Sequence, residues 1–470
     1  MMKKNRQMEG ELLMERIIEP KVQIPKARQI FSNNELKKLI VPLLIEQFLM
    51  LLVGMIDTLM VSYAGEAAVS GVSLVAQVNL IFIAVFTALA SGGAVVISQY
   101  IGRKDKKNTV LSAGQLIMVS IIISTIITGL ILIFRIPILG FLFGKVESDV
   151  MQASQKYLFI TALSFPALAV YSACSSILRS MSKTNVTMYV SIIMNAINII
   201  GNYIGIFVLK AGVAGVAVPS LISRVVAAII MFVYCLNKDN LVYIKIKDMF
   251  RYEKSMVKKI VNIAIPNGIE GGMLNASKVA LSSIVAMFGT YQIAANGIAQ
   301  TFWGLSALFT IVMGPVYITV IGQCIGGDDY DAAKYYVNKL TRITMIGCLI
   351  WNIVVLLSVP YALKLYNLSP KTVELVILLC LIHNAACAFL HPFGFVLAFA
   401  LRAAGDVKYT MYTSVFATVI VRVALAYLFG VVFNMGVIGV AFAMVCDWIV
   451  RIILIATRYK SEKWKEFQVI

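Results

Sequence analysis

The sequence predicts an all-α polytopic membrane protein with twelve transmembrane helices arranged as two six-helix bundles. Of its 470 residues 60% are hydrophobic and only 14% are charged, and the mean hydropathy is +0.87. Many apolar stretches reach the length of about 20 residues with which a helix crosses a bilayer. The two halves of the chain also repeat one another, so each half is expected to form one bundle.

The predicted spans follow one another along the chain with short polar loops between them. They are residues 39–64, 71–101, 112–136, 157–180, 186–209, 212–236, 259–289, 291–325, 340–360, 373–403, 408–432 and 435–457. The preceding segment, 1–38, is polar and lacks an apolar core of the signal-peptide kind. We therefore expect it to be a short cytoplasmic lead-in.

The net charge of +18 is distributed unevenly. Lys and Arg gather in the N-terminal segment and in every second loop, as in RKDKK at 103–107 and RYKSEKWK at 458–465, whereas the alternate loops hold few. This is the positive-inside pattern of multi-pass membrane proteins. It predicts a cell-membrane protein with both termini in the cytoplasm, and it accounts for the excess charge without a nucleic-acid partner.

An internal repeat divides the chain. Residues 42–105 align without a gap with residues 266–329, at an offset of 266 − 42 = 224. The matched pairs include Pro42 with Pro266, Glu46 with Glu270, Gln99 with Gln323 and Asp105 with Asp329. Because each half holds an even number of spans, both halves enter the membrane in the same sense. A pseudo-two-fold axis along the membrane normal is then expected, as in transporters with parallel repeats, with a central cavity that opens alternately to each side.

The repeat and the loop charges together predict the domain organisation. The expected parts are a cytoplasmic N-terminal segment at 1–38, a first lobe at 39–236, a cytoplasmic linker at 237–258, a second lobe at 259–457 and a cytoplasmic tail at 458–470.

One carboxylate, Asp57, lies in the middle of an apolar span. An ionised group there is costly, so it usually faces a cavity or a partner and marks an ion path. Such a carboxylate can take up a proton, or keep its charge beside Na⁺ and other oxygens. Those oxygens are available on Asn198 and Asn202, which are four residues apart on one helix face, and on Ser220. Helix-to-helix hydrogen bonding remains the alternative role for all four.

Other polar residues in the spans are candidates for the substrate cavity. Glu46 shares a helix face with Asp57, and Glu270 is its counterpart in the second half; either could instead reach interfacial water or a loop cation. Lys278 needs a carboxylate or water, and His391 could titrate. A further pair, Asp447 and Arg451, is spaced to neutralise itself, whereas Arg179 is expected to anchor a helix end and Arg422 has no evident partner.

The chain resembles the multidrug and toxic compound extrusion (MATE) family over nearly its whole length after residue 38. The resemblance is carried by MIDTLMVSYAG in the first span, by SQYIGRKD, by LRS and LRAAGD, and by the duplicated GVAGVAV and GVIGVAF. It implies an antiporter that expels organic cations as H⁺ or Na⁺ enters. Such a protein needs no cofactor beyond the coupling ion.

The resemblance also implies site residues. Asp57, Asn198, Asn202 and Ser220 fall on the cation site of the first lobe, where Na⁺ would meet Asp57, Asn198 and Asn202. The family often has a second carboxylate where Asn202 stands, so we expect one monovalent cation per cycle here. Acids that some members carry in the second lobe are replaced, near Leu274 and at His391.

The sequence also bears on two other functions. A flippase for a lipid-linked glycan or another anionic lipid would need several cavity cations; Lys278 and Arg422 favour it, and the intramembrane acids oppose it. An enzyme is not expected, because the chain has no HExxH, no GxSxG and no paired catalytic aspartates. The expected partners are small lipophilic organic cations and membrane lipids, and the expected state is a monomer.

Overall fold

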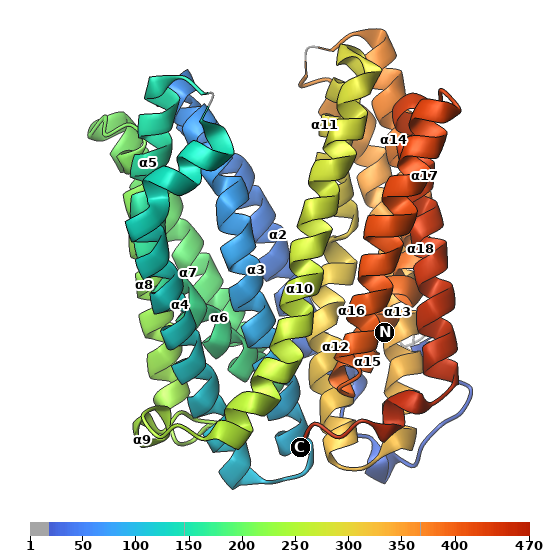
Figure 1. Ribbon diagram of the computed structural model, residues 1–470. Coiled ribbons are helices and arrows are strands. Elements are labelled where there is room, and N and C mark those ends of the chain that lie inside the picture. Colours follow the sequence, from blue (N-terminus) through green and yellow to red (C-terminus); the bar gives the residue numbers. More distant parts are fainter. Residues whose placement is uncertain (1–17, 145, 367) are drawn as a thin grey trace, which may run out of the picture. The chain divides into compact units, whose positions relative to one another are not determined.

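A computed structural model describes residues 18–144, 146–366 and 368–470, and it confirms the all-α class. This part of the chain forms helices joined by short turns and contains no β-strand (Figure 1). Residues 1–17 of the predicted cytoplasmic segment lie outside the described residues.

The number of spans agrees with the sequence prediction. Among the residues that the structure describes, eleven helices are long and apolar enough to cross a membrane, and one bent pair brings the count to twelve. The pair consists of α5 (Ser148–Leu163) and α6 (Phe165–Ser180), which meet at an angle of 46°. Pro166 lies in the first turn of α6, where its missing N–H is tolerated, but proline cannot continue the hydrogen-bond ladder from α5.

The first half of the chain contains helices that correspond to the first six predicted spans. With α5 and α6 they are α2 (Asn33–Ser62), α3 (Glu66–Gly102), α4 (Lys106–Phe143), α7 (Thr184–Tyr203) with its π-helical continuation η2 (Ile204–Val208), and α8 (Ala214–Leu236).

The second half begins after the short helix α9 (Ile246–Met249) and is interrupted by several π-helical turns. Its elements are α10 (Lys254–Val285), η3 (Ala286–Phe288), α11 (Thr290–Ser306), α12 (Leu308–Gly326), α13 (Tyr330–Leu363), α14 (Pro370–His391), η4 (Pro392–Val396), α15 (Leu397–Ala403), α16 (Val407–Val415), η5 (Phe416–Arg422), α17 (Val423–Tyr427), η6 (Leu428–Val432), α18 (Gly436–Lys460) and η7 (Lys463–Glu466).

The repeat recurs in the way two corresponding helices begin. Asp105 is the N-cap of α4, and its carboxylate accepts a hydrogen bond from the Asn108 backbone N–H at 3.1 Å. Asp329 is the N-cap of α13 and accepts from the Ala332 N–H at 2.9 Å. An aspartate at this position satisfies a backbone donor that the helix leaves open. The duplicated sequence thus produces the same local structure in both halves.

The contacts divide the chain into two compact units. The N-terminal unit comprises Asn34–Gly272, and the C-terminal unit joins the segment before Asn34 to Met273–Val469. One boundary therefore falls inside α10, and the predicted linker 237–258 lies within the N-terminal unit. The Gln115 side chain on α4 explains this, because it donates to the carbonyls of Asp248 and Arg251 at 2.7 and 2.6 Å. The domain limits inferred from the repeat remain a prediction.

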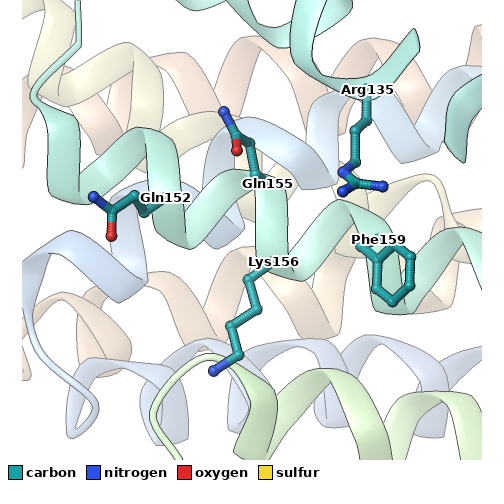
Figure 2. A pocket seen from close by; sticks show the side chains of 5 residues that line it. All are labelled: Arg135, Gln152, Gln155, Lys156 and Phe159. Atoms are coloured by element: carbon teal, nitrogen blue, oxygen red, sulfur yellow. The ribbon is translucent and has the colours of Figure 1, made fainter. Parts of the chain in front are cut away.

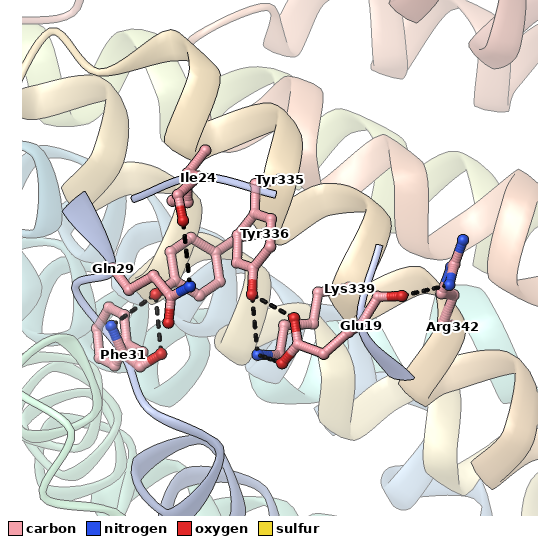
Figure 3. A network of polar contacts seen from close by, with 8 residues as sticks. All are labelled: Glu19, Ile24, Gln29, Phe31, Tyr335, Tyr336, Lys339 and Arg342. Carbon is pink, nitrogen blue, oxygen red and sulfur yellow. Dashed lines mark hydrogen bonds and ion pairs between the residues drawn. The ribbon is translucent and has the colours of Figure 1, made fainter. Parts of the chain in front are cut away.

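The described part of the N-terminal segment is docked on the C-terminal unit (Figure 3). Glu19 binds Lys339 Nζ at 2.6 Å and accepts from the Tyr335 hydroxyl at 2.5 Å. Phe31 exchanges two backbone hydrogen bonds with the Tyr336 hydroxyl, at 2.7 and 2.8 Å. Near them η1 (Lys26–Arg28) brings Arg28 to Asp329, with Nε to Oδ2 at 2.9 Å. This segment, Glu19–Phe31, is called the N-terminal strap below.

Candidate functional site

Asp57 lies on α2 among side chains from α7 and α8, all within the N-terminal unit. Asn202 Nδ2 donates to Asp57 Oδ1 at 2.7 Å. Asn198 lies one turn earlier on α7, and Ser220 on α8 lies 3.0 Å from its amide. Asn198, Asn202 and Ser220 are buried, with exposures of 7%, 0% and 8%, whereas Asp57 is half-buried. The structure therefore brings together all four residues that the sequence assigned to the cation site.

The Asn198 amide adds to the hydrogen bonds on the carboxylate. In the orientation that satisfies both of its ends, the amide nitrogen lies 2.8 Å from Asp57 Oδ1 and 3.2 Å from Oδ2. Its oxygen then accepts from the Ser220 hydroxyl at 3.0 Å. Two neutral amides thus donate to one carboxylate.

One positive charge, that of Arg224, acts on Asp57 without forming an ion pair with it. Arg224 on α8 attracts the carboxylate electrostatically, but its guanidinium donates to Ser164 Oγ at 2.8 Å. Within the described residues Asp57 forms no ion pair. Its charge is therefore stabilised by amides and left available to a small cation. Sequence spacing could not reveal the contact of Arg224 with Ser164, because the two residues are 60 positions apart.

Close packing of α7 and α8 holds the site together. A Cβ at Gly205 would lie 2.2 Å from the Gly215 carbonyl oxygen, and one at Gly201 would lie 2.6 Å from Pro219 Cβ. Only glycine allows two backbones to approach in this way. Asn202 lies between the two glycines of α7 and η2, so the glycines fix its distance from Ser220. Gly215, the second glycine of GVAGVAV, thus has a packing role next to the site.

Glu46 and Asp57 lie along the same contact between α2 and α7, as their shared helix face predicts. Glu46 is buried, with Oε1 accepting from Arg179 Nη2 at 2.7 Å and Oε2 from the Thr187 hydroxyl at 2.9 Å. The helix anchor expected of Arg179 is thus an ion pair with this carboxylate. That Glu46 also lines the substrate cavity remains a prediction.

The charged group on α18 contains the predicted pair and one further partner. Arg451 Nη2 forms the expected i,i+4 ion pair with Asp447 Oδ1, at 4.0 Å. Arg422 is a closer partner of the same carboxylate, because its Nε and Nη2 both donate to Asp447 Oδ2, at 3.0 and 2.5 Å. Arg451 donates to the hydroxyls of Ser414 and Thr418, each at 2.7 Å. Spacing on one helix could not reveal a partner on η5.

The remaining cavity candidates are divided between the units. Glu270, which is buried, belongs to the N-terminal unit, whereas Lys278, which is exposed, and His391 belong to the C-terminal unit. His391 is buried, and its Nδ1 lies 3.2 Å from Thr310 Oγ1 and 3.3 Å from Cys387 Sγ.

His391 also has an aromatic surrounding. The centre of its ring lies 4.4 Å from that of Trp448 and 4.5 Å from that of Phe395. The Arg451 guanidinium in turn lies 4.4 Å from the centre of the Phe395 ring. The charges that act on His391 from nearby include Arg451 and Arg422, and both are positive.

Comparison with known proteins places this architecture in a family. The model of the family described as MatE matches residues 42–204 and 266–428, whose starts are 266 − 42 = 224 residues apart. This offset equals that of the repeat, so the family match finds the same duplication.

Relatives resemble the chain over almost its full length. The uncharacterized transporter YisQ of Bacillus subtilis is 29% identical over 452 residues, covering 93% of this chain and 98% of its own. The probable multidrug resistance protein NorM of Thermotoga maritima is 24% identical over 471 residues, covering 96% of each chain.

A solved structure has the same fold. It is described as the outward-facing conformation of a multidrug resistance MATE family transporter, and it matches with a TM-score of 0.85 at 21% identity, covering 95% of this chain and 100% of that chain. These likenesses do not favour the flippase alternative. Because the family model matches both halves, the chain belongs to the MatE family of multidrug efflux transporters, which are membrane proteins and not enzymes.

Proposed function

We propose that this transporter exports lipophilic organic cations in exchange for H⁺ or Na⁺, and that Asp57 binds the coupling ion. The observation that carries the proposal is the set of partners around the Asp57 carboxylate. Amides of Asn198 and Asn202 donate to it, and within the described residues it has no ion-pair partner. A charge kept in a membrane span without a permanent counter-ion is characteristic of an ion path.

The surroundings of Asp57 suit either coupling ion. A proton adds directly to the carboxylate. Na⁺ prefers oxygen ligands, and the amides of Asn198 and Asn202 can turn their oxygens toward it with Ser220 nearby. Asn202 Oδ1 is buried and accepts no hydrogen bond from the described residues, so it is available for such a role. One carboxylate holds one charge, and one monovalent cation neutralises it.

Exchange follows if the substrate and the coupling ion compete for the same negative charge. An organic cation drawn toward Asp57 from the cytoplasm cannot be held once H⁺ or Na⁺ has neutralised the acid. Entry of the small cation from outside then releases the substrate there. Alternating access of the two lobes would expose the site to each side in turn.

Ethidium efflux from vesicles containing the purified protein tests this proposal. A Na⁺ gradient and a pH gradient are imposed separately, with the membrane potential clamped at zero. We expect one gradient to drive efflux in the native protein, and Asp57→Asn to reduce efflux to that of protein-free vesicles. Asp149→Asn, which removes one negative charge from the first turn of α5, should retain native efflux.

Two outcomes would contradict the proposal. Efflux that responds to neither gradient would exclude coupled antiport by H⁺ or Na⁺. Full activity of Asp57→Asn would exclude Asp57 as the coupling site. Size-exclusion chromatography and thermal unfolding of both variants establish that they are folded.

A further inference from the structure

The segment 245–252, which includes α9, carries large apolar side chains that the protein leaves uncovered. Phe250 is 85% exposed, Tyr252 62% and Ile246 55%. Apolar side chains that are exposed within a span face lipid, but these three lie in the predicted cytoplasmic linker, 237–258. A cluster of exposed apolar side chains outside the spans marks a contact surface for a partner.

Basic residues alternate with these apolar ones. Lys245, Lys247 and Arg251 are exposed, and the only acidic residue of 245–252 is Asp248. In the part of the chain that the structure describes, Lys247 and Arg251 form no ion pair. The segment thus presents three cations together with three large apolar side chains. This combination is typical of segments that bind an anionic lipid surface.

Contacts with α4 hold the segment at the depth of the membrane boundary. Gln115 donates to the carbonyls of Asp248 and Arg251, at 2.7 and 2.6 Å. Its Oε1 accepts from the Glu253 N–H at 2.9 Å. Gln115 lies inside the predicted span 112–136, roughly 5 Å along the helix axis from the start of that span. A linker extended into the cytoplasm would not contact this side chain.

A second set of contacts joins the start of the linker to the end of α8 (Figure 1). The Ile244 N–H donates to the Cys235 carbonyl at 2.8 Å, and Ile244 is itself buried. Asn240 Nδ2 donates to the Tyr234 carbonyl, also at 2.8 Å. Both acceptors are among the last residues of the predicted span 212–236. The linker is therefore folded back on the ends of two spans, with its backbone fixed there.

Cations at the other end of α4 have different surroundings (Figure 2). Arg135 and Lys156 line a hollow between α4 and α5. The Arg135 guanidinium carbon lies 5.0 Å from the centre of the Phe159 ring, and its Nη1 donates to the Leu132 carbonyl at 3.2 Å. The aromatic ring is thus already covered by a cation of the protein. Phe250, by contrast, has no aromatic or cationic neighbour among the described residues.

We infer that 245–252 is an interfacial anchor that binds anionic phospholipids of the cytoplasmic leaflet. The charge distribution predicts that this end of α4 and α8 faces the cytoplasm, where anionic lipids attract basic segments. The aromatic side chains enter the headgroup region, and Lys247 and Arg251 meet lipid phosphates. A soluble acidic protein fits less well, because lipid headgroups occupy the space at this depth. The anchor is independent of the proposed antiport.

Hydrogen–deuterium exchange of the full chain in lipid nanodiscs tests this anchor. Discs of dioleoyl phosphatidylcholine alone are compared with discs that also contain dioleoyl phosphatidylglycerol. We expect the backbone amides of 245–252 to exchange at least about ten-fold more slowly in the mixture, because each Lys or Arg near an anionic surface contributes about five-fold to binding. Equal exchange in both discs would overturn the inference.

Two variants test the role of the positive charges. Lys245→Gln/Lys247→Gln/Arg251→Gln removes three cations and should exchange at the same rate in both discs. The charge-conserving variant Lys245→Arg/Lys247→Arg/Arg251→Lys should keep the native difference between the discs. A native difference in the first variant would contradict binding through these residues.

The matched control removes three cations from the predicted non-cytoplasmic side of the same unit. Arg135→Gln/Lys156→Gln/Lys210→Gln should leave the exchange of 245–252 unchanged in both discs. An equal loss of protection in this control would show that net charge, rather than the segment, causes the difference, and it would overturn the inference.

Phe250→Ser tests whether the aromatic side chain enters the headgroup region. It keeps the charge of the segment, and we expect it to lose about ten-fold of the protection in the mixture, the contribution expected from burial of a Phe side chain. Full protection in Phe250→Ser would exclude this insertion. Equal protection by soluble polyglutamate on the phosphatidylcholine discs would show that an acidic polymer is sufficient, and it would overturn the assignment to a lipid surface.

Discussion

Local partners distinguish the intramembrane carboxylates from one another. Glu46 is paired with Arg179, and Asp447 is paired with Arg422. Asp57 instead receives amide hydrogens. A buried acid with a permanent counter-ion is already neutralised, whereas an acid held by neutral donors keeps a charge that a mobile cation can compensate. This difference is the reason we propose Asp57, rather than Glu46 or Asp447, as the residue that binds the coupling ion.

A second carboxylate at position 202 should change the number of coupling ions. Asn202→Asp places two carboxylates next to one another, and two like charges at this distance require a second cation. At zero membrane potential, a ten-fold ion gradient then sustains roughly a 100-fold substrate gradient instead of a ten-fold one. The limiting ethidium ratio across vesicles measures this change.

The control for this prediction is Asn195→Asp. It adds one charge to α7 on a buried side chain that makes no contact with Asp57. We expect it to keep the native ratio if it folds. An unchanged limiting ratio in an active Asn202→Asp protein would contradict a stoichiometry set by the number of acids.

At the scale of elements, the glycines of α7, η2 and α8 determine the geometry of the candidate site. Gly205 and Gly215 lie so close that backbone meets backbone. These backbone atoms cannot move aside in the way that the end of a flexible side chain can. The distance between Asn202 and Ser220 is therefore a property of the helix pair.

Gly205→Ala should destabilise the protein by about 1–3 kcal/mol and lower its melting temperature by a few degrees. The new Cβ would lie 2.2 Å from the Gly215 oxygen, so the helices must separate and the amides must move from Asp57. Thermal unfolding in detergent and ethidium efflux measure the two effects.

Gly54→Ala is the matched control on α2. A Cβ there meets no atom within 4 Å, although the residue is one turn from Asp57. We expect native stability and native efflux. Equal losses in both variants would show that helix contact at Gly205 is not the cause.

At the scale of the whole molecule, the N-terminal strap joins segments more than 300 residues apart in the sequence. Arg28 binds Asp329, and Glu19 binds Lys339. Burial alone raises the pKa of Glu19, but hydrogen bonds from Lys339 and Tyr335 hold that pKa below its usual range. The hydrogen bond from Arg28 likewise lowers the pKa of Asp329.

These shifts predict that the strap detaches in acid. A carboxylate whose pKa is lowered in the docked state stabilises docking above its ordinary pKa of about 4, and this contribution is lost as the pH falls through the lowered value. A nitroxide attached to Val22→Cys, an exposed site with 77% accessibility, reports the change. Its mobility should be constant from pH 8 to 5 and rise below pH 4.

Two variants check the cause of this transition. Glu19→Gln/Asp329→Asn removes the two carboxylates whose pKa values are lowered on docking, so the label should be mobile already at neutral pH. Lys371→Gln, on α14, removes a charge outside the strap contacts and should keep the native profile. A label whose mobility does not change with pH in the native protein would contradict docking through these ion pairs.

The sequence alone determined the fold class, the number of spans and the three polar residues grouped with Asp57. Apolar length, the even number of spans in each half and the spacing of Asn198 and Asn202 are local or periodic features, and a membrane restricts such segments to helices. The offset of 224 residues also appears in the family match. These features need no knowledge of which helices meet.

The tertiary structure alone decided the partners of the charged residues. Asp447 pairs with Arg422 on η5 in addition to Arg451 on its own helix, and Glu46 pairs with Arg179 across 133 positions. It also assigned the strap to the C-terminal unit and divided α10 between the units. Contacts between distant segments depend on how helices pack side chain against side chain, and periodicity along one helix carries no information about a neighbour.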